Sequence, residues 1–185
     1  MAWRLPRASV ILWMLCLCTD GPSRGHASEP GPAAEYLLKT AFLYNVAKFV
    51  EWPEDTSAPP GTPLTLCMTG NAFGATIESL AGKPVQGRPL MIRTRPDKET
   101  QGTCDILFIE FKEPAQIAAM LDPIKDRPIL TVCDQPSCAQ QGIMVNLQRQ
   151  HDKINIELNL EAAQRARLKF SSQLIKLAHV VGAKP

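Results

Sequence analysis

Two cysteines, Cys133 and Cys138, enclose the four residues DQPS at the end of an apolar run, in the sequence LTVCDQPSC. Thiols at such a spacing can bind a metal ion, act as a redox pair, or form a small covalent loop. Two further cysteines, Cys67 and Cys104, lie earlier in the chain, and two more lie near its beginning. The compartment decides which chemistry applies, because disulfides are rare wherever thiols are kept reduced.

The beginning of the chain predicts export. Arg4 and Arg7 precede an apolar run of 11 residues at positions 8–18, and the sequence GHA ending at Ala27 has the small residues that a signal peptidase requires. The run is shorter than the ~20 residues that a helix needs to span a bilayer, which disfavours the alternative of a membrane anchor. We expect residues 1–27 to be a signal peptide cleaved near Ala27, with no stable membrane anchor in the mature protein.

The charge balance argues against a nucleic-acid partner. Removal of residues 1–27 takes away three of 20 basic and one of 18 acidic residues, which leaves 17 of each. No basic run and no alternation of basic with aromatic residues remains, and these features are typical of nucleic-acid binding. We therefore expect no nucleic acid as a partner.

The four remaining cysteines favour disulfides over a metal site. An even number of cysteines in an exported chain is typical of a disulfide framework. His151 and His179 show no metal-ligand spacing, and C-x4-C without a second close pair is not a zinc motif. We expect no metal and no cofactor. Four cysteines allow three connectivities, among which Cys133–Cys138 is sterically easy because Pro136 favours a turn.

Hydrophobic periodicity predicts one α/β domain over residues 35–182, after a flexible lead at 28–34. Strands are expected at residues 64–68, 88–95, 104–111 and 127–133, with two more around a polar turn within 142–160. Helices are expected from Glu35 to the loop at Pro53, from Asn71 as N-cap to Gly82, from Pro114, and over 161–181. The predicted fold is a mostly parallel sheet flanked by helices, with an antiparallel hairpin and a long C-terminal amphipathic helix.

Two segments suggest chemistry without meeting its requirements. The glycine turn GNAFG at residues 70–74 could hold an anion at a helix start, but it matches no phosphate-binding fingerprint, so a tight turn is favoured. Ser171 and Ser172 lie near Lys169 and Lys176, but neither serine has the S-x-x-K spacing, and all four are expected in the middle of a helix.

The carboxylates also form no catalytic constellation. Asp105 and Glu110 lack an acid-base partner nearby in the sequence, and we expect the protein not to be an enzyme. Asp134 follows a strand at the edge where α/β proteins bind ligands, although a turn residue is the favoured interpretation. The candidate ligand or partner contacts are Asn71, Arg88, Asp134, Asn146 and Glu157.

Several segments together resemble the YfiR family of periplasmic proteins, also called the DUF4154 domain. They are LLKTAFLYNVAKFVEWP at 37–53, GNAFGATIESLAGKPVQGRPLMI at 70–92, PILTVCD at 128–134, GIMVNL at 142–147 and INIELNLEAAQRARLKFSSQLIKLAHVV at 154–181. The first and last of these segments are specific in combination. Arg167 departs from the family pattern AAxxAGLK, in which many members have glycine at this position.

The resemblance implies an α/β domain in the periplasm, usually a homodimer. It implies binding to the periplasmic domain of an inner-membrane GGDEF sensor protein, a diguanylate cyclase, which is thereby repressed. Low repressor activity then means more cyclic di-GMP, more exopolysaccharide and more biofilm. It also implies two disulfides, Cys67–Cys104 and Cys133–Cys138.

The two implied disulfides are expected to differ. Closing the six-residue loop of Cys133–Cys138 is worth roughly 2 kcal/mol in the loop-entropy model, and the 38-residue loop of Cys67–Cys104 roughly 4. Cys67 lies near the end of one strand and Cys104 near the start of another, so parallel neighbours need an offset. We expect Cys133–Cys138 to be reduced more readily, as a redox switch that frees the cyclase or as a bridge that only stiffens a loop.

Two functions remain open from the sequence. The leading one is a non-catalytic regulator that captures a sensor domain and shifts its population of conformations. The alternative is a small-molecule-binding module, linked to a sensor or to an outer-membrane uptake system, with a pocket at the carboxyl ends of the strands.

Overall fold

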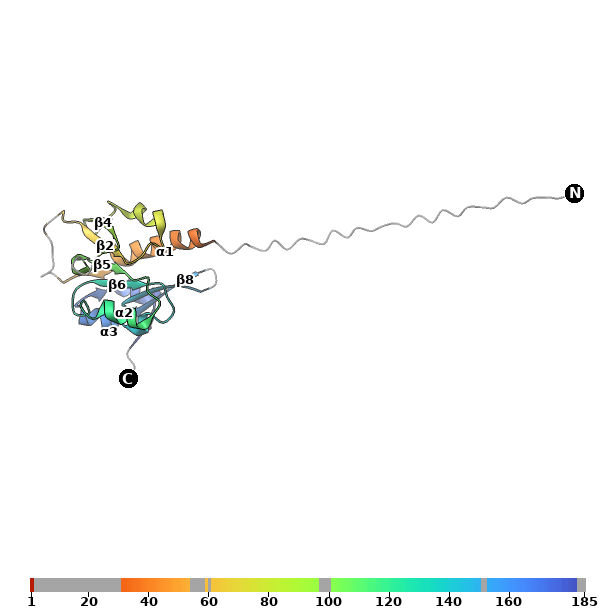
Figure 1. Cartoon of the computed structure of the whole chain (residues 1–185). Helices are drawn as coiled ribbons and strands as arrows, with labels where there is room; N and C mark the ends of the chain where they lie inside the picture. The colour runs from red at the N-terminus through yellow and green to blue at the C-terminus, as the bar shows by residue number, and fades with distance from the viewer. Residues whose placement is uncertain (2–30, 54–58, 60, 97–100, 151–152, 183–185) are drawn as a thin grey trace.

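A computed structural model describes residues 1, 31–53, 59, 61–96, 101–150 and 153–182 of the 185-residue chain (Figure 1). The expected signal peptide lies outside the described residues apart from Met1, as do residues 28–30 of the expected lead. Residues 32–34 are not a flexible lead, because helix α1 (Pro32–Lys48) already includes them. Pro32 is suited to the first helical turn, where its fixed φ is helical and its missing N–H is not needed.

The main sheet has eight strands in the order β10-β8-β7-β6-β5-β2-β4-β3. Its parallel centre consists of β4 (Arg88–Thr94), β2 (Leu64–Met68), β5 (Ile106–Phe108), β6 (Leu130–Cys133) and β7 (Val145–Gln150). The predicted antiparallel hairpin is present as β7 with β8 (Lys153–Asn159), and β3 (Pro84–Val85) is antiparallel to β4. The expectation of a mostly parallel sheet flanked by helices is therefore confirmed.

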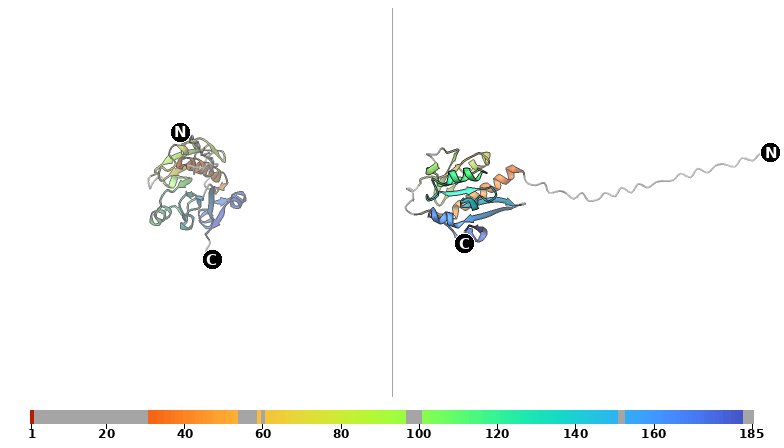
Figure 2. Two further views of the ribbon diagram at one scale, coloured as in Figure 1. Left: turned by 90° about the vertical axis from the view of Figure 1, so that its right-hand side faces the viewer. Right: turned by 60° about the horizontal axis from the view of Figure 1, so that its bottom comes forward.

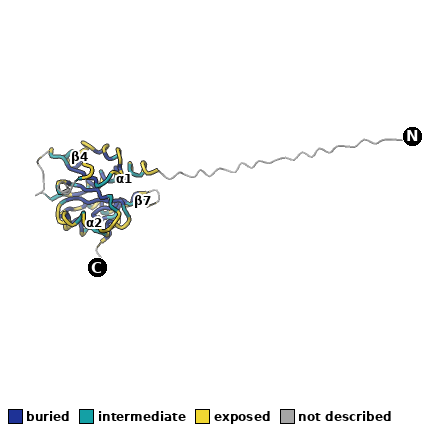
Figure 3. The backbone as a smooth tube through the Cα atoms, in the orientation of Figure 1, coloured by how far each residue is buried: buried dark blue, intermediate teal, exposed yellow. Residues whose placement is uncertain are grey.

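The central strands are covered on both faces, and residues alternate between two cores. In β2, Leu66 belongs to a core that includes Leu43 of α1, whereas Cys67 belongs to a second core that includes Ile117 of α2 (Pro114–Leu121). All four described cysteines lie in this second core. Figure 3 shows the strands as buried and the outer sides of the helices as exposed. Because the side-chain period of a strand is two, this alternation places α1 and α2 on opposite faces of the sheet.

The predicted long C-terminal helix is wrong. The chain instead forms α3 (Leu160–Arg165), β9 (Lys169–Phe170), α4 (Ser172–Leu177) and β10 (His179–Val181). Arg167 has a φ of 60°, which is left-handed and ends the first helix, and Ser171 Oγ accepts a hydrogen bond from Leu174 N to start the second. Ser171 and Ser172 therefore stand at the start of a short helix rather than in the middle of a long one.

The C-terminal segment completes the fold at two places. β9 pairs with β1 (Val50–Glu51), which directly follows α1, so that Val50 lies opposite Phe170. β10 joins the edge of the main sheet parallel to β8, beside the hairpin in blue in Figure 2. Residues more than a hundred positions apart thus meet at the end of α1.

Candidate functional site

A group of polar residues lies together at the carboxyl ends of three neighbouring strands, β2, β5 and β6. The residues that follow these strands are the glycine turn after β2, Glu110 after β5 and Asp134 after β6. Ala72 N donates to Glu110 Oε2 at 2.9 Å, and the backbone N–H groups of Gly70 and Asn71 also bond this carboxylate. The glycine turn therefore holds an anion, and that anion belongs to the chain itself.

Close approach of Glu110 also requires glycine at position 70. A Cβ on Gly70 would overlap the Oε2 atom of Glu110, so a side chain there would displace the carboxylate. The expectation that Asn71 is an N-cap is wrong: the following 3-10 helix, η2 (Gly74–Leu80), begins three residues later with Phe73 at its N-cap. Asn71 is exposed, and it takes part in the cluster through its backbone N–H.

The environment of Glu110 raises the pKa of its carboxyl above that of an exposed glutamate. Burial raises the pKa of Glu110, and the nearby Asp134 carboxylate raises it further, although the backbone N–H of Ala72 and those of Gly70 and Asn71 act in the opposite direction. Glu110 Oε1 is buried and has no hydrogen-bond partner among the described residues. The pKa of Glu110 therefore depends on Asp134 and on the backbone N–H groups of residues 70–72.

Asp134 pairs with Lys39, which lies 95 positions earlier in the chain. Lys39 Nζ of α1 lies 2.7 Å from Asp134 Oδ2 and 2.5 Å from Glu35 Oε1, and Arg149 Nη1 of β7 lies 3.1 Å from Glu35 Oε2. Burial alone would lower the pKa of Lys39, but its hydrogen bonds to Asp134 and Glu35 outweigh burial and raise that pKa. Asp134 is thus a buried partner of α1 rather than an exposed turn residue.

The Cys133–Cys138 disulfide starts one residue before Asp134. The structure joins Cys133 to Cys138 with their Cα atoms 6.6 Å apart. Both cysteines are completely buried, which argues against the expectation that this bridge is reduced more readily than Cys67–Cys104. The reason is that Cys133 points into the core beside α2, and the loop returns to that core at Cys138 before η4 (Ala139–Gln141).

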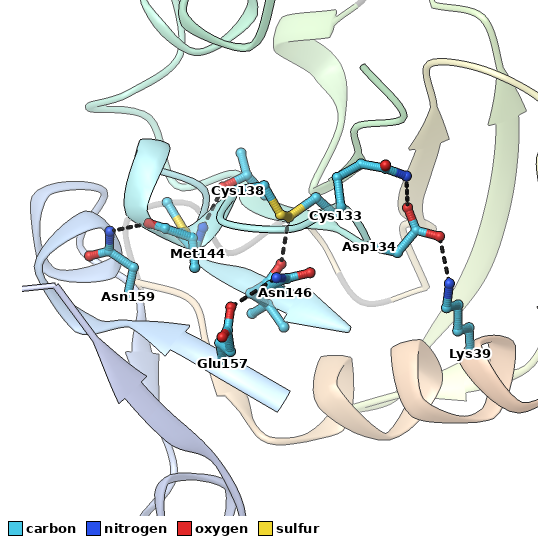
Figure 4. Close-up of a disulfide and its surroundings, with 12 residues drawn as sticks. Lys39, Cys133, Asp134, Cys138, Met144, Asn146, Glu157 and Asn159 are labelled. Carbon is cyan, nitrogen blue, oxygen red and sulfur yellow. Dashed lines mark hydrogen bonds and ion pairs between the residues drawn. A yellow bond between two sulfur atoms is a disulfide. The ribbon is translucent and has the colours of Figure 1, made fainter. Parts of the chain in front are cut away.

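Three elements hold the disulfide loop in place (Figure 4). Lys39 of α1 holds Asp134, as described above. Asn146 of β7, which is the register partner of Cys133, donates from Nδ2 to Glu157 Oε2 of β8 at 2.8 Å. Asn159, at the end of β8, donates from Nδ2 to the Ala139 carbonyl at 2.8 Å. We call residues 133–138 the clasp: Lys39 of α1 contacts it directly at Asp134, Asn146 of β7 is paired with its first cysteine, and Asn159 of β8 holds η4, which directly follows it.

Asn159 was missed by sequence reasoning. Its Oδ1 accepts a hydrogen bond from Ala162 N, which makes Asn159 the N-cap of α3 as well as a partner of η4. Asparagine directly before the sequence LEAAQR is a recognisable N-cap signal, but the continuous helix expected there concealed the boundary.

The other disulfide, Cys67–Cys104, joins the fourth residue of β2 to a residue that lies two positions before β5. Its Cα atoms are 5.9 Å apart, although the register partner of Cys67 in β5 is Leu107. The expected offset is met because Cys104 precedes β5 and lies in the core beside Cys67 rather than in the ladder. The structure therefore has the two bridges that the family resemblance implies.

Arg88 lies away from the clasp. Its guanidinium donates to Asp105 Oδ1 at 3.1 Å and to the carbonyls of Thr62 and Pro63, at the amino ends of β2, β4 and β5. Of the candidate contacts, the structure thus gathers Asn71 and Asp134 at the carboxyl edge, and Asn146 and Glu157 beside the clasp. Whether any of them binds a ligand or a partner remains a prediction.

A pocket of about 540 Å³ lies beside the β1–β9 ladder. Trp52 lines it, together with Gln164, Arg167 and Lys169, and the Trp52 Nε1 atom is buried without a hydrogen-bond partner among the described residues. The pocket lies within the ≈300–1,000 Å³ range of small-molecule sites.

The described part of the chain offers no group of three or more histidine, cysteine, aspartate or glutamate residues that could hold a metal ion. None of its helices has the length and apolar character needed to cross a membrane.

The fold is that of a disulfide-containing α/β domain, in which all four described cysteines are paired. The chain belongs to the YfiR/HmsC-like family, whose DUF4154 model matches residues 36–179. A search of curated proteins gives no match. Two disulfides fit an oxidising compartment.

Proposed function

We propose that this protein is a non-catalytic regulator in the periplasm that represses an inner-membrane diguanylate cyclase by binding its periplasmic sensor domain. Repression lowers cyclic di-GMP and with it exopolysaccharide and biofilm. The observation that carries the proposal is the match to the YfiR/HmsC-like family across 36–179. The two disulfides support the periplasm, because this compartment is oxidising.

Repression by binding requires a preference for one sensor conformation. A regulator that binds only the inactive sensor shifts the sensor population toward that state by mass action. Moving the population from 1:99 to 99:1 requires a difference in binding free energy of about 5.5 kcal/mol. This is within reach of an ordinary protein interface, so no catalysis is needed.

We assign the sensor contact to the beginning of α1. Leu37 and Leu38 are 60% and 42% exposed there, whereas Leu43 and Val46 of the same helix are buried against the sheet. Large apolar side chains on the outer side of a helix are typical of an interaction surface. The next residue, Lys39, reaches the clasp through Asp134, so the contact and the clasp are physically connected.

The experiment compares deletion of the gene with two variants in the native host. Deletion is expected to raise cyclic di-GMP. Replacing Leu37 and Leu38 together by glutamate should do the same at normal protein abundance and should abolish co-purification with the sensor domain. The control is Leu177→Glu on α4, where the leucine is 75% exposed and a glutamate is introduced away from α1.

The proposal fails if deletion leaves cyclic di-GMP unchanged and the purified protein binds no periplasmic domain of the host's GGDEF proteins. If both double and control variants bind normally while deletion raises cyclic di-GMP, the regulator role stands and the assignment to α1 is wrong.

A homodimer is part of the same proposal, since family resemblance implies it. Light scattering of the purified mature protein should give twice the monomer mass, and a monomer at all accessible concentrations would contradict this part.

The second candidate function is capture of a small molecule. The pocket beside Trp52 supports it, because an indole N–H without a partner favours a ligand with a hydrogen-bond acceptor. Quenching or shift of tryptophan fluorescence by periplasmic extract fractions, lost in Trp52→Phe, is the measurement for this candidate.

A further inference from the structure

A second, smaller pocket lies where the end of α2 faces α3, beside the beginnings of β6 and β7. Its volume is about 190 Å³. Leu121, Met144 and Ala162 give it an apolar lining, while Gln141, Lys125 and Arg165 contribute polar groups. A space of this size admits only a small occupant.

Gln141 requires a hydrogen-bond donor. Its Oε1 atom is buried and has no partner among the described residues. A buried amide oxygen left unpaired opposes folding, because it has lost its water and gained nothing in exchange. A molecule in the pocket that carries an O–H or N–H group would satisfy this oxygen.

The charged side chains that line the pocket are Asp122, Lys125 and Arg165, and their net positive charge favours an anion. Lys125 Nζ is 2.9 Å from Asp122 Oδ1, but Arg165 Nη1 is 3.8 Å from its nearest described carboxylate oxygen, Glu161 Oε1, which is too long for a hydrogen bond. Lys125 and Arg165 line the same pocket and repel each other electrostatically. A carboxylate would relieve this repulsion and match the planar fork of arginine.

We propose that this pocket binds a small 2-hydroxycarboxylate with a short branched apolar side chain. The carboxylate pairs with Arg165 and Lys125, the hydroxyl donates to Gln141 Oε1, and the side chain fills the space lined by Leu121 and Met144. A hydroxyl suits Gln141 better than an ammonium group, because Asp122 already pairs with Lys125 and an added cation would meet the net positive charge of the lining.

The pocket is connected to the clasp. Gln141 belongs to η4, which starts directly after Cys138, and Gln141 N donates to the Cys138 carbonyl at 3.1 Å. Breaking the Cys133–Cys138 bridge should therefore weaken ligand binding. This inference goes beyond the proposed function and does not rest on it, because it concerns the other end of the strands from the α1 surface.

The test is a titration of the ¹⁵N-labelled mature protein with 2-hydroxy-4-methylpentanoate, followed by amide chemical shifts up to about 10 mM ligand. The matched probes are 4-methylpentanoate, which lacks the hydroxyl, and 3-methylbutan-1-ol, which lacks the carboxylate. Leucine tests whether an ammonium group is accepted in place of the hydroxyl. We expect saturable shifts at Gln141, Gly142 and Arg165 with the hydroxy acid, and at least about tenfold weaker binding of the other three.

Variants separate the two polar contacts. Arg165→Ala should weaken binding of 2-hydroxy-4-methylpentanoate and of 4-methylpentanoate by about tenfold or more. Gln141→Leu should remove only the preference for the first of these over the second. The control, Lys176→Ala, removes an exposed cation of α4 outside the pocket and should bind like the unchanged protein.

Several outcomes overturn the proposal. They are shifts that map away from the pocket, shifts equal for all four probes, binding that Arg165→Ala leaves unchanged, and no saturable shift at all, which would mean a pocket holding water only. Loss of repression in the host is a separate measurement, so failure of this proposal and failure of the regulator role are distinguishable.

Discussion

Lys39 Nζ lies 2.7 Å from Asp134 Oδ2, and this ion pair joins two residues 95 positions apart. Only 4% of the lysine side chain and 3% of the aspartate side chain are exposed. Since Asp134 is the first residue of the loop closed by Cys133 and Cys138, the pair fixes α1 to the clasp. Its burial makes the pair important for stability in a way that surface pairs are not.

Removing one partner of this pair should destabilise the protein strongly. Lys39→Met is expected to lower the free energy of unfolding by about 3–5 kcal/mol, because Asp134 is left buried without its cation. Urea unfolding with intact disulfides measures the change. Lys125→Met is the matched control, since the Lys125–Asp122 pair has a similar distance but exposed side chains, and its effect on stability should be far smaller than that of Lys39→Met. Equal effects of the two substitutions would contradict the role assigned to Lys39.

Glu35 should make stability depend on pH in the acid range. Burial acts to raise the pKa of Glu35, but hydrogen bonds from Lys39 and Arg149 outweigh burial and hold the pKa below its ordinary value of 4.5. A carboxyl whose pKa is lower in the folded state stabilises the fold above 4.5, and this contribution is lost as pH falls through the folded pKa.

The comparison is Glu35→Gln at two pH values. At pH 7 we expect this variant to be less stable by about 1 kcal/mol, and near pH 3 the difference should shrink. Glu113→Gln, at an exposed position before α2, is the control. A difference independent of pH would show that Glu35 acts by packing rather than by charge.

The Cys133–Cys138 bridge should resist reduction in the folded protein as well as Cys67–Cys104 does. Cys67, Cys133 and Cys138 have no exposed surface, and Cys104 is 4% exposed, so a thiolate reaches either bridge only after local opening. Thiol labelling after mild reductant should therefore be slow for both bridges and should accelerate with urea. Rapid labelling of Cys133 alone in native buffer would contradict this and would support the redox-switch hypothesis for Cys133–Cys138.

The clasp can be tested for regulation directly. Replacing both Cys133 and Cys138 by serine should cost roughly 2 kcal/mol or somewhat more, since the loop is short. If the proposed repressor depends on the clasp, cyclic di-GMP rises in the host at normal protein abundance. Unchanged cyclic di-GMP excludes a switch, and raised cyclic di-GMP with lost protein assigns the bridge to stability alone.

The backbone conformation at Arg167 accounts for the glycine that many family members have at this position. Its φ of 60° is left-handed, a conformation that glycine adopts without steric cost and other residues do not. Arg167→Gly should be more stable than Arg167→Ala by about 1 kcal/mol, because both lose the guanidinium and only alanine keeps a Cβ. Urea midpoints of the two variants give the difference, and equal midpoints would show that the turn relaxes.

The mature protein should begin at about Ser28. Intact mass of the protein recovered from the periplasmic fraction measures this directly. A mass that includes residues 1–27 would mean a retained leader and an anchored protein.

Local patterns predicted the centre of the sheet well. β2 spans the residues expected for it, and the β7–β8 hairpin has the alternation that the sequence indicates, since Ile154, Ile156 and Leu158 are all buried. These strands are determined by their own side chains. The C-terminal segment was misjudged because apolar residues of α3, β9 and α4 happen to recur at helical spacing, while the break at Arg167 carries no proline or glycine.

The site was largely hidden from the sequence because its contacts are long-range. Nothing near Asp134 indicates that Lys39 will neutralise it, and nothing near residues 70–72 indicates that Glu110 will supply their anion. The disulfide pairing came from family resemblance, since spacing alone left three connectivities. Burial of Cys138 depends on how η4 returns to the core, which is a tertiary property.

The pairing of Val50 with Phe170 has a consequence for how the chain folds. β1 directly follows the first helix, but its partner in the small ladder, β9, lies 120 residues later in the chain. β1 therefore has no partner strand until nearly the whole domain is present, although α1 itself packs on η2 and β3, which follow it closely in the sequence. A chain that stops before residue 169 lacks β9, α4 and β10 together, so a late truncation should behave as an unfolded protein instead of a shortened one.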